Sequence, residues 1–140
     1  MGVCIKSTNG KYSFDMGAGG FFNLRKNIAY CMDREFGEHY ALLARCNTQA
    51  EYNAHDRKAE QLINSKGLDK EYSDVLDFLY ADDCGGKIDY RTCKKIYDLI
   101  KDVDFGSKCF RYAILVHNDY EEFKLFLRDC YARKCCMRWL

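Results

Sequence analysis

The first seventeen residues carry the pattern that most constrains the fold. Apolar and polar residues alternate over positions 3–6 and again over 12–16, on either side of the pair Asn9-Gly10. Asn-Gly between two alternating runs predicts a β-hairpin over residues 2–17, because both residues tolerate the positive φ of a type I′ turn. An isolated hairpin is only marginally stable, so the rest of the chain must cover its apolar face.

The remainder of the chain predicts about five helices as that cover, because apolar residues recur there every three or four positions. We expect Gly37 to kink or split the first helix, Gly67 to end the second and Asp89 to cap the fourth. Asn118 and Asp119 offer a cap for the last. The expected helices cover about 21–46, 51–65, 70–80, a segment after Asp89, and 120–134, with a turn at 82–87 and a β-leaning apolar run at 110–117.

These elements predict one α+β domain spanning residues 1–140, in which helices pack on a small antiparallel sheet. The apolar end at 135–140 could add an edge strand to the hairpin. A length of 140 residues with 48% hydrophobic residues suits a single core. No apolar run reaches the ~18–20 residues that a membrane helix needs, and the N-terminus has no secretory stretch, so we expect a cytoplasmic protein with no membrane partner.

The charge and the cysteines exclude further classes. A net charge of +1 argues against a cationic binder of nucleic acid, so we expect no direct nucleic-acid partner. The nine cysteines are odd in number and include no Cys-x-x-Cys pair, which favours reduced thiols in a cytosolic protein over disulfides or zinc. The three histidines, at 39, 55 and 117, are far apart in sequence. We therefore predict no metal site and no cofactor.

The sequence does not predict a calcium site either. Residues 81–92 resemble a calcium loop around Gly86 and Ile88, but only Asp83 falls on a main ligand position. We interpret this segment as a corner between helices.

A glycine-rich corner is the first candidate binding site. The predicted second strand leads into glycines that open a helix, where free N–H groups and the helix dipole favour an anion. An arginine one turn later could clamp a phosphate with its two-pronged guanidinium. The candidate ligand residues are Gly17, Gly19, Gly20, Asn23 and Arg25. The alternative is a purely structural strand-to-helix corner.

A segregation of charge gives the second candidate site. Residues 71–89 carry six acids and one base, whereas residues 124–138 carry five bases and one acid. We expect the acids to face solvent on one short helix, where they could steer a basic protein partner. The alternative is an ordinary solvated surface. The candidate partner-binding residues are Asp74, Asp77, Asp82 and Asp83.

Catalytic signatures are missing from the sequence. It contains no Gly-x-Ser-x-Gly elbow, no His-Glu-x-x-His motif and no local cysteine–histidine motif. We therefore assign no catalytic residue and expect a non-enzymatic protein, with a small thiol-dependent enzyme as an alternative.

Three segments carry a resemblance: KYSFDMGAGGFFNLR at 11–25, FLYADDCGGKIDYRTCKKIYDLIK at 78–101 and FKLFLRDCYARKCCMRWL at 123–140. Together they resemble a group of short uncharacterised proteins of Gram-positive gut-type bacteria, their phages and mobile elements. The resemblance implies a phage or mobile-element context but carries no function of its own. From that context we expect a non-enzymatic binding protein in the host cytosol that inhibits an effector of a bacterial defence system by protein–protein contact. The alternative is a sponge or reader of a phosphate-bearing signalling nucleotide. The target and the oligomeric state stay open.

Overall fold

The computed structural model describes residues 2–10, 13–81, 85–103 and 117–140, and for residues 2, 14–19 and 117–120 the backbone only. It confirms the predicted α+β class. The strands are β1 (Gly2–Ser7), β2 (Ser13–Gly17), β3 (Gly86–Ile88) and β4 (Met137–Trp139). The helices are α1 (Ala18–Met32), α2 (Arg34–Leu42), α3 (Gln49–Lys66), α4 (Leu68–Glu71), α5 (Ser73–Tyr80), α6 (Tyr90–Ile100) and α7 (His117–Ala132), with a 3-10 turn η1 (Leu43–Arg45).

The sheet has the strand order β2-β1-β4-β3, and every neighbouring pair is antiparallel. The predicted C-terminal strand is confirmed, but it lies inside the sheet between β1 and β3 instead of at an edge. The third strand was not predicted, because three residues beginning with a glycine look like part of a turn. Its partner β4 is about fifty residues further along the chain, so no local pattern reveals the pairing.

The hairpin is confirmed, whereas its turn differs from the prediction. The last residue pair of the hairpin is Lys6 with Ser13, so more than two residues separate its strands and the turn is not a two-residue type I′ turn. Gly10 has a φ of 73°, and its N–H donates to the carbonyl of Ser7 at 3.1 Å. Asn9 does not adopt a positive φ, as a type I′ turn would require.

The long first helix predicted over 21–46 is two helices, and the break is at Asp33 instead of Gly37. The Asp33 side chain accepts a hydrogen bond from the N–H of Phe36 at 2.9 Å and so caps α2. Gly37 has another role, because a Cβ built on it would lie 2.5 Å from the Cα of Tyr30. Its missing side chain lets α2 approach α1 closely.

The remaining helix ends follow local signals in most cases. Gly67 ends α3 in the left-handed conformation with a φ of 67°, and Asp89 caps α6 through the N–H of Thr92, both as predicted. The helix predicted at 70–80 is divided into α4 and α5. Helix α7 is described from His117, so Asn118 and Asp119 lie within it and do not precede it. The β-leaning run at 110–117 falls almost entirely outside the described residues.

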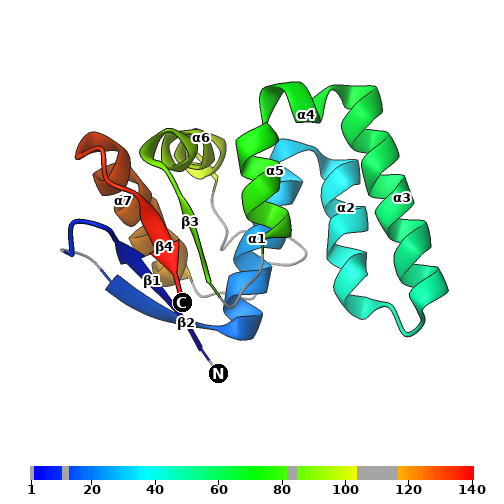
Figure 1. Ribbon diagram of the computed structural model, residues 1–140, viewed down its shortest axis with the longest axis horizontal. Helices are drawn as coiled ribbons and strands as arrows, with labels where there is room; N and C mark the ends of the chain where they lie inside the picture. The colour runs from blue at the N-terminus through cyan, green and yellow to red at the C-terminus, as the bar shows by residue number, and fades with distance from the viewer. Residues whose placement is uncertain (1, 11–12, 82–84, 104–116) are drawn as a thin grey trace.

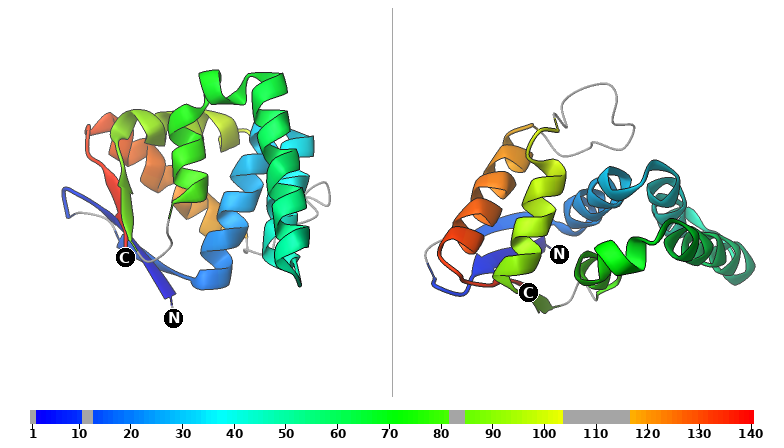
Figure 2. Two further views of the ribbon diagram at one scale, coloured as in Figure 1. Left: turned by 45° about the vertical axis from the view of Figure 1, so that its right-hand side comes forward. Right: turned by 90° about the horizontal axis from the view of Figure 1, so that it is seen from above.

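Within the part of the chain that the structure describes, helices cover one face of the sheet. Figures 1 and 2 show α6 and α7 over that face and α5 beside α1, while α2, α3 and α4 lie beyond α1, further from the sheet. The covered face carries Val3 and Ile5 of β1 and Met137 and Trp139 of β4, all of which are buried. No described helix is long and apolar enough to cross a bilayer.

The indole of Trp139 is the centre of the packing between sheet and helices. Its ring centroid lies 5.9 Å from that of Phe21 in α1 and 5.3 Å from that of Phe78 in α5. On the sheet side, a Cβ built on Gly86 would lie 2.2 Å from an indole carbon. The glycine at the start of β3 therefore makes room for the tryptophan.

This close approach yields a stability prediction. The substitution Gly86→Ala should lower the free energy of unfolding by about 1–3 kcal/mol, because the added methyl group overpacks the indole. Urea unfolding measures the change. The substitution Lys87→Ala, one residue along on the opposite face, is the control and should have little effect. Equal stability of the two variants would contradict the packing described for Trp139.

Candidate functional site

The predicted glycine corner exists as a strand-to-helix junction. Gly17 ends β2, and α1 begins at the next residue, so Gly19 and Gly20 lie in the first helical turn. Asn23 is buried, with 8% of its surface exposed. The junction therefore presents the N-terminal N–H groups of a helix, as predicted, and whether it binds an anion stays a prediction.

Arg25 belongs to the protein core, which differs from the role of an anion clamp. Only 5% of its surface is exposed, and its Nη1 donates to the carbonyl of Ala81 at 2.9 Å. The guanidinium carbon lies 4.3 Å from the ring centre of Phe21 and 5.8 Å from that of Trp139. Guanidinium groups stack well on aromatic faces, so these contacts join the arginine to the tryptophan cluster.

The acidic candidates are divided by the structure. Asp77 is exposed on α5, as predicted. Asp74 is half-buried, pairs with Lys95 of α6 at 3.1 Å and accepts a hydrogen bond from Thr92 at 3.2 Å. The expectation that it points freely to solvent is therefore wrong. Asp82 and Asp83 lie outside the described residues.

Lysines of α6 also offset the acidic surface. Asp98 pairs with Lys94 of α6 at 3.1 Å and with Lys101, the residue after the end of α6, at 3.8 Å. Residues 71–89 contain six acidic residues, but the fold places Lys95 of the following helix beside one of them, Asp74. Steering of a basic partner by this surface is correspondingly weakened.

The uncovered face of the sheet carries a different charge pattern. The register pairs Ser13 with Lys6, Lys6 with Arg138, and Arg138 with Lys87, in one line across all four strands. Side chains of directly paired residues lie on the same face of a sheet. We call Lys6, Arg138 and Lys87 the basic row; Lys6 is half-exposed and the other two are exposed.

The described side chains place no counter-charge on the basic row. Within the part of the chain that the structure describes, none of its three cations forms a hydrogen bond or an ion pair. Asp15 occupies the register position opposite Cys4, diagonal to Lys6 on the same face of the sheet, and its side chain lies outside the described part of the structure. Many other lysines are paired: Lys66 with Asp33 at 3.0 Å, Lys95 with Asp74 at 3.1 Å and Lys124 with Glu121 at 3.0 Å.

A hollow adjoins the basic row at the hairpin end of the open face. Its volume is about 360 Å³, and the side chains around it are polar. Thr8 accepts a hydrogen bond from the backbone N–H of Cys136 at 2.9 Å, so its hydroxyl hydrogen remains available. The lining residues are Lys6, Ser7, Thr8, Gly10, Ser13 and Arg138.

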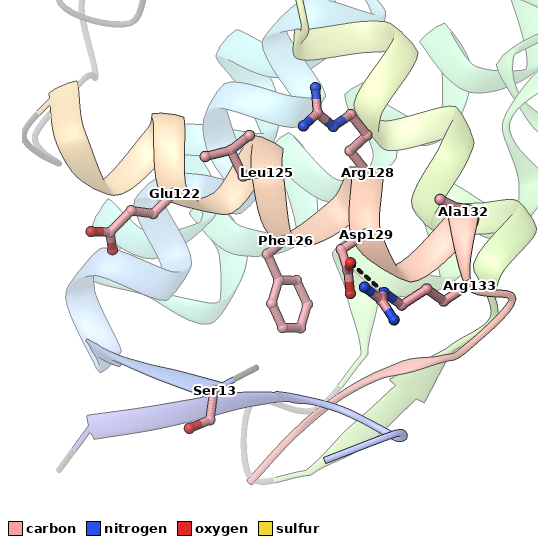
Figure 3. Close-up of a pocket in the computed structure, with 8 residues that line it drawn as sticks. All are labelled: Ser13, Glu122, Leu125, Phe126, Arg128, Asp129, Ala132 and Arg133. Atoms are coloured by element: carbon pink, nitrogen blue, oxygen red, sulfur yellow. Dashed lines mark hydrogen bonds and ion pairs between the residues drawn. The ribbon is translucent and has the colours of Figure 1, made fainter. Parts of the chain in front are cut away.

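A larger cavity of about 680 Å³ lies between α7 and the start of β2 (Figure 3). Leu125 and Phe126 form its apolar wall, and Leu125 is 55% exposed. Its charges balance one another, since Glu122 and Asp129 face two arginines around the rim. Arg133 donates to Asp129 at 2.7 Å (Figure 3), so its charge is already compensated. The cavity therefore has no electrostatic preference for one class of ligand.

The fold also brings together two histidines that are far apart in sequence. His39 of α2 and His55 of α3 lie with their Nδ1 atoms 3.3 Å apart. Burial and the neighbouring His55 and Lys58 lower the pKa of His39, although Glu35 and Glu38 act in the opposite direction. A hydrogen bond between the rings requires that at least one imidazole be neutral.

This pair predicts that stability depends on pH. Because the pKa of His39 is lower in the folded protein than in the unfolded chain, the unfolded chain binds the proton more readily. The free energy of unfolding should be greatest above about pH 6.5, the usual histidine pKa, and should fall as the pH drops below it. Urea unfolding across this range measures the loss, which should be smaller in the His39→Gln variant. Identical pH profiles would contradict the assignment.

The described cysteines form no disulfide with one another, and the reduced state of all nine thiols stays a prediction. Burial raises the pKa of Cys31 to about 11. A hydrogen bond that the Cys130 thiol makes to Cys93, together with burial, raises the pKa of Cys130, and burial raises that of Cys135. A cysteine nucleophile needs the opposite shift, so these three thiols are poor nucleophiles. The described residues also contain no group of three side chains suited to hold a metal ion.

Comparisons with protein families, with characterised proteins and with solved structures found no match for this chain. The functional argument therefore rests on the geometry of the sites.

Proposed function

We propose that the protein is a non-enzymatic binding protein whose ligand is anionic and docks on the open face of the sheet. One observation supports this proposal above the others, namely that the described residues give the basic row of Lys6, Arg138 and Lys87 no ion-pair partner. Like charges directly opposite one another destabilise a sheet. A bound anion would relieve that repulsion, so part of the binding energy is already present in the free protein.

The other candidate surfaces support a function less well. Lysines compensate the acidic surface of α5 and α6, and arginines and carboxylates balance one another around the α7 cavity. The glycine corner offers helix N–H groups but not Arg25, which is held in the core. Among the described residues, the basic row combines exposure, a single sign of charge and an adjoining hollow.

This proposal is nearest to the predicted alternative of a reader or sponge for a phosphate-bearing ligand, with the site moved from the glycine corner to the open face. Inhibition of a defence effector by protein–protein contact stays a prediction, as does a cytosolic location in a bacterial host.

Cation-exchange chromatography tests the proposal without knowledge of the ligand. The variants Lys87→Glu and Lys70→Glu have the same net charge, and both lysines are exposed, but only Lys87 lies in the basic row. Lys87→Glu should elute at clearly lower salt than Lys70→Glu, because it disrupts the surface that contacts the anionic matrix. Elution of both variants at the same salt concentration would show that the row does not form an anion-binding surface.

A further inference from the structure

The open face points to a particular class of anion: we infer that it binds a compact ligand carrying several phosphoryl groups in a short chain, such as an oligophosphate or a nucleoside polyphosphate. This inference rests on the proposed function and specifies its ligand. Three arguments support it: the geometry of the basic row, the hydrogen-bond donors around the hollow, and the lack of aromatic rings among the described side chains of the open face.

The first argument is the geometry of the basic row. Lys6, Arg138 and Lys87 stand on three adjacent strands, and neighbouring strands are about 4.8 Å apart, so the row spans about 10 Å. A single phosphate could be reached by all three flexible side chains only if they converge on the middle strand. A short chain of phosphoryl groups can place negative charge beside each of them.

The second argument is the donor chemistry at the hairpin end of the row. Lys6 contributes an ammonium, Arg138 a guanidinium fork, and Thr8 and Ser13 contribute hydroxyls. Arginine forks match the oxygens of phosphate in a two-pronged geometry, and the ammonium adds a compact positive charge. The hollow of about 360 Å³ exceeds the size of one phosphate and leaves room for the remainder of a small molecule.

The third argument concerns larger anions such as nucleic acids and acidic proteins. The described side chains of the open face do not include the groups that usually bind them. Proteins that bind single-stranded nucleic acid stack its bases on aromatic side chains. The described outward-facing side chains of the sheet are Cys4, Lys6, Ser13, Lys87 and Arg138, which include no aromatic ring. The described residues around the hollow likewise form no apolar centre of the kind that a protein–protein interface usually has. The surface therefore suits a small, highly charged ligand.

Isothermal titration calorimetry at low salt tests the inference, with sodium tripolyphosphate as the probe. Orthophosphate, a hexaglutamate peptide and an oligothymidylate are the comparison ligands. Tripolyphosphate should bind at least about tenfold more tightly than orthophosphate, because it contacts several cations at once. It should also bind more tightly than the peptide and the oligonucleotide, and its affinity should fall as salt is added.

Single neutral substitutions locate the site. Lys6→Gln, Arg138→Gln and Lys87→Gln should each weaken tripolyphosphate binding by about three- to tenfold, the effect of losing one partly exposed charge contact. Lys70→Gln should leave it unchanged. A melting curve of each variant checks folding, and the row variants should melt no lower than the wild type, because each substitution removes repulsion.

The possible outcomes test two claims separately, namely the chemical class of the ligand and the location of the binding site. Tighter binding of the peptide or the oligonucleotide that is lost in Lys87→Gln would overturn the phosphate inference but leave the anion-binding face in place. Tripolyphosphate binding that Lys87→Gln, Lys6→Gln and Arg138→Gln do not weaken would overturn both. No binding of any probe at millimolar concentration would also overturn the phosphate inference, and the chromatographic comparison would then decide on the face itself.

Discussion

The packing of Trp139 is the interaction on which the rest of the structure depends. Its indole contacts Phe21 of α1 and Phe78 of α5, and the guanidinium of Arg25 lies beside it. Gly86 leaves the space that the indole fills on the sheet side. Through these contacts one side chain near the end of the sequence joins the sheet to two helices and fixes the position of the central strand β4.

The same packing determines what the opposite face of the sheet displays. Successive side chains of a strand point to opposite faces, so burial of Met137 and Trp139 directs Arg138 outward. The register then places Arg138 between Lys6 and Lys87. A shift of β4 by one residue would expose the tryptophan, so the core maintains three like charges in a line that electrostatics alone would disfavour.

Local signals in the sequence predicted a good part of the fold. The hairpin, the glycine stop at Gly67 and the Asp89 cap depend on residues close together in the chain, and each is confirmed. The break at Asp33 was missed because Gly37 is the more conspicuous helix breaker, although it serves close packing instead. Strand β3 was missed because its three residues gain their extended conformation from pairing with a distant strand.

The candidate sites show more clearly that local sequence patterns do not reveal contacts between distant segments. Arg25 was assigned to an anion by its place after a helix start, but aromatic residues from distant segments hold it in the core. The basic row could not be predicted, because its residues come from positions 6, 87 and 138 and meet only through the sheet register. A count of charges along the sequence showed a basic C-terminal segment but not the lysines that complete the row.

The most direct test of the account is a map of the residues that respond to an anion. In a ¹⁵N-labelled sample titrated with tripolyphosphate, amide shifts should concentrate at Lys6, Lys87 and Arg138 and around the hairpin loop. Residues of the α7 cavity and of the acidic surface should move little. Shifts confined to the glycine corner at 17–25 would contradict the account, since they would place the anion at the N-terminus of α1 and leave the open face of the sheet without a ligand.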